Sequence, residues 1–284
     1  MFTALWNSPA ARLRWWGTGC ALVVLSLVVG APAIERIPLE SHEIFVVQST
    51  REMAARGDWL TPWFNGQARL NKPPASYWLT GVVAAADGRL PVAQAWHARA
   101  VSVLAAAGLV ALTLWLGTLL FDRATAGLGA LLLASSAGLF TYAHNARPDM
   151  LYAFCVSLML AAAIAALRRA TAQTGGRWAG FGLAALTWLG FIAATLTKGP
   201  HVPAIALLGV AVAAWRQAGA WRAVVGGLRL WPGLVAALLA CGSWWLWLRL
   251  KVDRESLGGS QLAGSLLLPS LSKLGDPYYF YRPL

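Results

Sequence analysis

Residues 100–120 read AVSVLAAAGLVALTLWLGTLL, a run of 21 residues without Asp, Glu, Lys or Arg. A helix needs about 20 such residues to cross the hydrocarbon core of a bilayer. The whole chain fits a membrane setting, because 58% of its 284 residues are hydrophobic and only 12% are charged. A helix satisfies its own backbone hydrogen bonds where water is absent, so the sequence predicts an all-α, polytopic integral membrane protein.

Six further uncharged runs are long enough to span a bilayer, which gives about seven predicted transmembrane helices. These six runs are Trp15–Ile34, Ala124–Ala143, Met150–Leu167, Trp178–Thr197, Gly199–Trp215 and Leu230–Leu248. The first run is longer than the apolar core of a signal peptide, so it is expected to be an uncleaved anchor. The uncharged segment Pro73–Ala86 is too short to span and is expected to lie at the interface or to re-enter.

Basic residues are divided unevenly between the predicted loops, and this division gives the chain an orientation. With a cytoplasmic N-terminus, nine arginines lie in the inner segments, whereas the short outer loops hold only Arg147 and Lys198. The positive-inside rule favours that orientation. Ten of the eleven acidic residues then lie on the outer side. The net charge of +12 is therefore explained mainly by basic residues in the cytoplasmic loops, and it gives little support for nucleic-acid binding. Because the acidic residues gather on the outer side, acid–base chemistry is expected there.

The least membrane-like part of the chain is the first predicted outer loop, residues 35–97. Within it, residues 43–56 are predicted to form an amphipathic helix that lies along the bilayer surface and ends at Gly57. Residues 69–74 read RLNKPP, and the two prolines hold the backbone rigid beside Arg69 and Lys72. These two cations suit a lipid phosphate, although basic side chains also snorkel to an interface without any ligand.

Two shorter outer segments carry further candidates. Residues 144–150 read HNARPDM, and a carboxylate at the mouth of a membrane helix, here Asp149, is a functional candidate. The alternative is that Asp149 complements the helix dipole with Arg147 as its surface partner. In the turn 197–201, TKGPH, Lys198 is either an interface anchor or another phosphate ligand. No Gly-rich phosphate loop is evident, so no nucleotide cofactor is expected.

Several separated motifs, taken in order, resemble the polyprenyl-phosphate-sugar glycosyltransferases of the GT-C fold. In particular, they resemble the bacterial branch that contains the lipid A aminoarabinose transferase and relatives of the protein O-mannosyltransferases. The similarity covers roughly residues 35–200. The motifs are Glu43, Arg51-Glu52-Met53, Gly57-Asp58-Trp59-Leu60, Pro62, Asn65-Gly66, Lys72-Pro73-Pro74, Tyr77-Trp78, Ala98-Arg99, Ala146-Arg147-Pro148-Asp149-Met150 and Leu196-Thr197-Lys198-Gly199-Pro200.

The resemblance implies a multi-pass transferase of the bacterial inner membrane with a periplasmic active site. Such an enzyme moves a sugar from a polyprenyl phosphate carrier, such as undecaprenyl phosphate, to a hydroxyl of a lipid, glycan or protein acceptor, with inversion. By position, Asp149 matches a catalytic acid of the second outer loop, and Glu43 matches the glutamate of the acidic motif in the first. Lys72 matches the lysine that holds the carrier phosphate, and Arg69, Arg147 and Lys198 are further candidate phosphate ligands.

The chain also departs from the pattern of this family. Many relatives have Asp directly before the glutamate, where this chain has His42, and an acidic residue before the lysine, where it has Asn71. Imidazole and carboxylate suit zinc or manganese, so His42, Glu43 and Asp149 are candidate ligands of a divalent metal ion. Two alternatives to an active transferase stay open. One is a non-enzymatic membrane transporter or lipid flippase, and the other, which the His42 departure supports, is a catalytically inactive paralogue.

The expected domain organisation is a transmembrane glycosyltransferase domain over residues 1–250. Residues 251–284 are expected to be a periplasmic loop that leads toward a C-terminal region beyond this chain. We therefore expect the 284-residue chain alone to bind the carrier weakly and to turn over little. The motifs do not specify the sugar, the acceptor or the oligomeric state.

Overall fold

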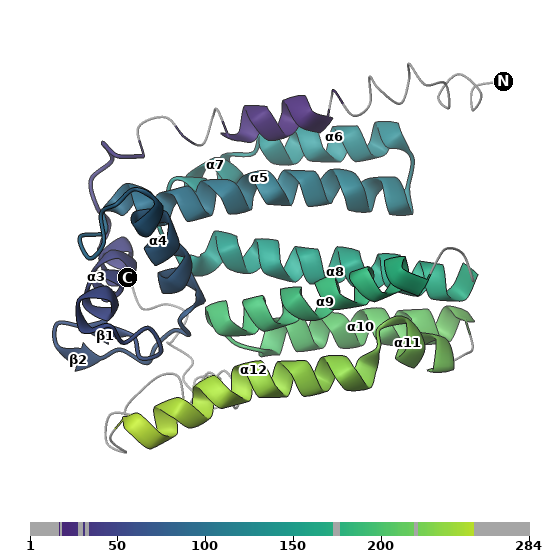
Figure 1. Ribbon diagram of the computed structural model, residues 1–284. Coiled ribbons are helices and arrows are strands. Elements are labelled where there is room, and N and C mark those ends of the chain that lie inside the picture. The colour runs from purple at the N-terminus through teal and green to yellow at the C-terminus, as the bar shows by residue number, and fades with distance from the viewer. Residues whose placement is uncertain are drawn as a thin grey trace, which may run out of the picture.

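The computed structural model shows long helices stacked side by side, with a small cap of helices and one hairpin at one end (Figure 1). It describes residues 17, 19–27, 31, 34–172, 177–218 and 221–252. The labelled helices are α3 (Ser41–Arg56), α4 (Ala75–Ala86), α5 (Ala95–Leu120), α6 (Arg123–Ala134), α7 (Ala137–Ala143), α8 (Pro148–Ala172), α9 (Arg177–Lys198), α10 (His201–Ala218), α11 (Trp221–Gly227) and α12 (Leu230–Lys251). The hairpin pairs β1 (Trp63–Phe64) with β2 (Gln67–Ala68) in antiparallel fashion.

The structure confirms a polytopic all-α membrane protein but not the predicted number of spans. Among the described residues, four helices are long and apolar enough to cross a bilayer: α5, α8, α9 and α12. α6 and α7 form a pair bent by 55°, so the predicted span over residues 124–143 is interrupted. The interruption has a local cause, because the hydroxyl of Ser136 accepts a hydrogen bond from the Leu139 N–H and starts a new helix.

Two other predicted spans also remain open. α10 overlaps the predicted span over residues 199–215. Its apolar part, His201–Arg216, is shorter than the four helices that are long enough to cross a bilayer. The first predicted span is helical over residues 19–27, and much of the rest of it lies outside the described residues. Residues 253–284, most of the predicted C-terminal loop, lie outside them as well. Seven spans therefore stay a prediction.

α8 and α9 pack closely against each other at a glycine. A Cβ atom added to Gly190 would lie 2.8 Å from the backbone nitrogen of Met159 and 2.9 Å from the carbonyl oxygen of Cys155. Only glycine permits that approach, so α9 rests directly on the backbone of α8. The two helices run in opposite directions, and the first turn of α8 therefore meets the last residue of α9 beneath the cap.

The cap consists of α3, the β1–β2 hairpin and α4, of which the sequence predicts α3, though not the hairpin. α3 ends where Gly57 adopts a left-handed conformation with φ 66°, as the sequence predicts. A buried cluster that includes Val47, Met53 and Tyr77 joins the cap to Ala98 of α5 and to Ala146, just before α8. The cap is therefore fixed on the end of the bundle where α8 begins.

Candidate active site

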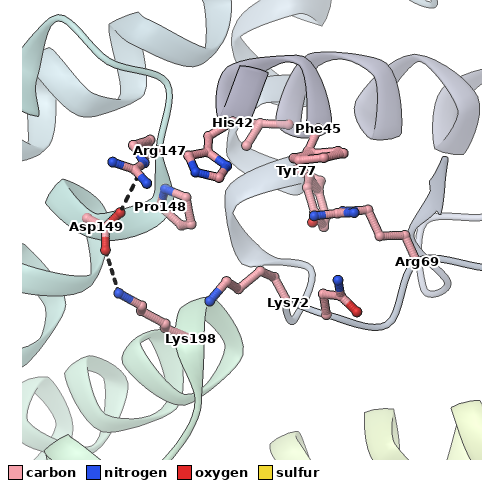
Figure 2. A pocket seen from close by; sticks show the side chains of 11 residues that line it. His42, Phe45, Arg69, Lys72, Tyr77, Arg147, Pro148, Asp149 and Lys198 are labelled. Carbon is pink, nitrogen blue, oxygen red and sulfur yellow. Dashed lines mark hydrogen bonds and ion pairs between the residues drawn. The ribbon is translucent and has the colours of Figure 1, made fainter. Parts of the chain in front are cut away.

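A cavity of about 420 Å³ lies between the cap and the ends of α8 and α9 (Figure 2). The cap supplies residues from α3, from α4 and from the loop between β2 and α4, and the bundle supplies the start of α8 and the end of α9. The lining residues are His42, Phe45, Val46, Arg69, Asn71, Lys72, Tyr77, Arg147, Pro148, Asp149 and Lys198. The structure thus brings together every candidate site residue from the sequence except Glu43.

Asp149 is held between two cations in this cavity. Lys198 donates a hydrogen bond to Oδ1, and the Nε of Arg147 lies 3.9 Å from Oδ2. The side chain of Asp149 is 32% exposed, and those of Lys198 and Arg147 are 34% and 35% exposed. A pair that water still reaches is worth at most about 1 kcal/mol. A stronger anion entering the cavity can therefore draw these cations away from the carboxylate.

Lys72 faces this group from the opposite wall (Figure 2). Burial lowers the pKa of its ammonium group, and the charge of Lys198 lowers it further, whereas Asp149 acts in the opposite direction. None of the carboxylates among the described residues forms an ion pair with Lys72. An anionic ligand would supply the missing negative charge.

Arg69 lies on the side of the cavity that carries aromatic rings. Its guanidinium carbon lies 3.7 Å from the ring centroid of Phe45 and 5.6 Å from that of Phe64, both cation–π distances. Its Nε is buried and has no hydrogen-bond partner among the described residues. A snorkelling arginine would extend freely into water. The stacking instead holds a planar donor at the wall of the cavity, where it suits a phosphate.

Glu43 occupies a different environment, because it is fully buried outside the cavity lining. Burial by itself would raise the pKa of its carboxyl group, but hydrogen bonds from Arg99 and from the backbone N–H groups of Glu40 and Ala146 outweigh it and lower the pKa. Glu43 is therefore ionised at neutral pH, and both of its oxygens already accept hydrogen bonds.

The residues present do not fit the metal site that the sequence suggests. The described part of the chain has no group of three His, Cys, Asp or Glu side chains that could hold an ion. Of the three candidate ligands, Glu43 is committed to Arg99, and Asp149 is paired with Lys198. Only His42, which is exposed at the cavity edge, is not committed in this way. The three side chains therefore do not offer a divalent ion a common set of ligand atoms.

Three residues near the site have no role assigned by the sequence reasoning. Arg99 is fully buried against Glu43, Ser102 contacts the chain just before α8, and Tyr77 lines the cavity. Arg99 had a usable signal, since it is a charged residue at the very edge of an uncharged run. The contact made by Ser102 depends on the helix packing, and nothing in the sequence around it signals that contact.

The sequence model of the family described as "Dolichyl-phosphate-mannose-protein mannosyltransferase" matches residues 42–254, which include the whole cavity. This chain belongs to that family. The match begins at the start of α3 and continues through α12, so it covers the cap and the long helices alike.

Curated relatives carry a more specific description. The chain is 30% identical over 203 residues to the undecaprenyl phosphate-alpha-4-amino-4-deoxy-L-arabinose arabinosyl transferase of Yersinia enterocolitica, covering 69% of this chain and 35% of the relative. It is 31% identical over 218 residues to the protein of that name from Pseudomonas aeruginosa strain LESB58, covering 73% and 37%. The chain thus spans about a third of the length of the curated relatives it matches.

A solved structure shows the same fold. The crystal structure of ArnT from Cupriavidus metallidurans bound to undecaprenyl phosphate matches with a TM-score of 0.68 at 22% identity, over 92% of this chain and 44% of that one. The apo crystal structure of that protein matches with a TM-score of 0.67. The match confirms the GT-C arrangement that the sequence motifs imply.

Proposed function

We propose that this chain carries the carrier-phosphate site of a membrane glycosyltransferase. The enzyme takes a sugar from a polyprenyl phosphate such as undecaprenyl phosphate and transfers it to a hydroxyl of a lipid, glycan or protein. The observation that carries the proposal is the cavity itself, which is lined by four cations, Arg69, Lys72, Arg147 and Lys198, and by a single carboxylate, Asp149. Such a site suits the phosphate of a lipid carrier, and the names of the curated relatives agree with it.

The proposed reaction is an inverting displacement at the anomeric carbon. The acceptor oxygen forms the new bond to that carbon as its bond to the phosphate oxygen breaks. The hydroxyl proton passes to Asp149, and the phosphate leaves with the electron pair of the broken bond. A positioned carboxylate can serve as general base, and fixed cations stabilise charge that grows on a leaving group.

The contact between Asp149 and Lys198 supports a link between donor binding and base activation. Lys198 donates a hydrogen bond to the carboxylate and partly neutralises its charge. A carrier phosphate that enters near Lys72 competes for Lys198, and the carboxylate is then free to accept a proton. Donor binding thus makes Asp149 a stronger base.

The transporter alternative is less well supported. A transport pathway places ionisable groups along the membrane interior, whereas the cations of this cavity gather at one end of the bundle, beneath the cap (Figures 1 and 2). In the proposed orientation that end faces the periplasm. Reporter enzymes fused after Arg169 and within the loop 35–97 test this orientation, and the expected result is a cytoplasmic and a periplasmic signal, respectively.

The experiment that tests the function follows a radiolabelled sugar on undecaprenyl phosphate in membranes that contain the chain. The expected result is a low level of label transfer to an acceptor, still above the level found with Asp149→Asn, together with weak binding of the carrier by the purified chain. Passage of the intact carrier across the bilayer with its sugar still attached would identify a transporter instead. Carrier binding with no difference between the wild type and Asp149→Asn would indicate an inactive paralogue.

A further inference from the structure

We infer that Arg99, Glu43 and Ser102 form a clamp that positions residues 145–149 and thereby sets Arg147 and Asp149 for the carrier phosphate. The inference rests on the proposed function of the cavity. The three clamp residues do not line the cavity, so each acts through the segment it holds. Glu43 is thus a positioning residue rather than a proton acceptor or a metal ligand.

The hydrogen bonds of Arg99 are complete. A guanidinium has five N–H donors in a fixed plane. Toward Glu43, Nε donates to Oε1 at 2.8 Å and Nη2 donates to Oε2 at 2.6 Å. Nη1 donates to the carbonyl oxygens of Ile34 and Ile37 at 2.6 and 2.8 Å, and Nη2 also donates to that of Pro38 at 3.0 Å. Five donors thus meet five acceptors, and Arg99 joins α5 to the segment that precedes α3.

The hydrogen bonds of Glu43 are complete in the same sense. A carboxylate offers about four acceptor positions. Arg99 takes one position on each oxygen, the Ala146 N–H donates to Oε1 at 2.7 Å, and the Glu40 N–H donates to Oε2 at 2.9 Å. No position remains for a substrate proton or a metal ion. The contact that bears on the cavity is the one with Ala146, because Ala146 directly precedes Arg147.

A second contact from α5 holds the neighbouring residue. The hydroxyl of Ser102 donates to the carbonyl oxygen of Asn145 at 2.7 Å. Two consecutive residues are thus fixed by buried groups before α8 starts at Pro148. Ala146 lies only three residues before Asp149 along the chain, so a shift of the held segment moves both Arg147, the proposed phosphate ligand, and Asp149, the proposed base. A misplacement of about 1 Å in such groups can cost roughly 100-fold in rate.

The test measures the dissociation constant for undecaprenyl phosphate, per folded molecule, with the chain in nanodiscs. We expect Glu43→Gln and Arg99→Gln each to weaken binding about 10-fold. Glu43→Gln replaces one acceptor oxygen by an NH2 group that faces other donors, and Arg99→Gln removes the guanidinium that holds the carboxylate in place. Either change lets the acceptor of the Ala146 amide shift, and Arg147 shifts with it. Ser102→Ala removes a single hydrogen bond and is expected to weaken binding about 2- to 5-fold. A merely structural role would lower the melting temperature of these variants and leave the affinity of the folded molecules unchanged.

Glu52→Gln is the matched control. Glu52 lies on the same helix, and its carboxylate also accepts hydrogen bonds from two backbone amides, those of Asn65 and Gly66 at 2.6 and 3.0 Å. Glu52 holds the hairpin and forms no hydrogen bond or ion pair with residues 145–149, so the Glu52→Gln variant should bind the carrier as tightly as the wild type. Equal affinities for the wild type and all three clamp variants would overturn the clamp.

The variants also distinguish a folding defect from a failure of the proposed function. Should the Glu43 and Arg99 variants fail to fold, Ser102→Ala decides the matter, and an unchanged affinity in that variant overturns the inference. Absence of carrier binding in the wild type would refute the proposed function of the cavity instead. Failure of the clamp and failure of the proposed function therefore give different results.

Discussion

The two carboxylates Glu43 and Asp149 lie close to the same turn, yet their surroundings differ in every respect that matters for chemistry. Glu43 is fully buried, and all its acceptor positions are occupied by the planar guanidinium of Arg99 and two backbone amides. Asp149 is about a third exposed and is paired with side chains that water also reaches. A saturated, buried pair holds a structure in place, whereas an unsaturated pair at a cavity wall can exchange its partners.

The largest difference between the two carboxylates should appear in turnover. Asp149→Asn keeps the size and most hydrogen bonds of the side chain but removes its charge and basicity. In any form of the protein that is active in sugar transfer, we expect a loss of about 10²- to 10⁴-fold in kcat with little change in carrier affinity. Initial rates measured against donor concentration provide the check. Near-normal turnover would mean that Asp149 only complements the dipole of its helix.

The next contrast concerns stability. Arg99→Met leaves the Glu43 charge buried without its partner, which should lower the free energy of unfolding by about 3–5 kcal/mol. Lys198→Met breaks a pair of similar chemistry at a partly exposed site and should cost about 1 kcal/mol or less. Denaturation with SDS in mixed micelles compares the two variants. Equal losses would mean that burial does not distinguish the two pairs.

Lys72 is expected to affect carrier binding but not stability. It has no carboxylate partner among the described residues, so Lys72→Ala should leave stability nearly unchanged while it weakens carrier binding about 10-fold. Arg168 is the matched control, because it is a cation that lines a second cavity, formed mainly by α8 and α10. Arg168→Gln should retain wild-type carrier affinity. A similar loss in both variants would indicate a general effect of charge rather than a phosphate site at Lys72.

The smallest expected effect is on the pH dependence of binding. Burial and the charge of Lys198 lower the pKa of Lys72. Carrier binding requires its ammonium form, so affinity should fall as the pH rises toward the ordinary lysine pKa of about 10.4, and the fall should begin below that value. Lys72→Arg keeps its charge throughout this range and should shift the fall to higher pH. An identical pH profile for the two proteins would show that Lys72 is not the titrating group.

Much of this molecule follows from local sequence patterns. The uncharged runs predict the long helices, Gly57 predicts the end of α3, and the motif residues that gather in the cavity are those expected to bind phosphate. Each of these features depends on neighbouring residues or on the shared order of the motifs. The break between α6 and α7 is a local effect as well, but two serines inside an apolar run are a weak signal.

The burial and the hydrogen-bond partners of Glu43 could not be predicted in this way. Its partners Arg99 and Ala146 lie 56 and 103 positions away along the chain, and only the folded structure shows that both approach one carboxylate. From sequence alone an acidic residue beside His42 suggests catalysis or metal binding. Tertiary packing decides instead that Glu43 is enclosed while Asp149 faces the cavity.

The central claim, that the cavity around Lys72 and Asp149 binds the phosphate of a lipid carrier, is tested most directly by comparing two lipids. The measurement is the dissociation constant of the chain for undecaprenyl phosphate and for undecaprenol, which has the same apolar chain but no phosphate. We predict that the phosphate form binds at least about 10-fold more tightly and that Lys72→Ala removes most of this difference. Equal affinity of the wild-type chain for the two lipids would contradict the account.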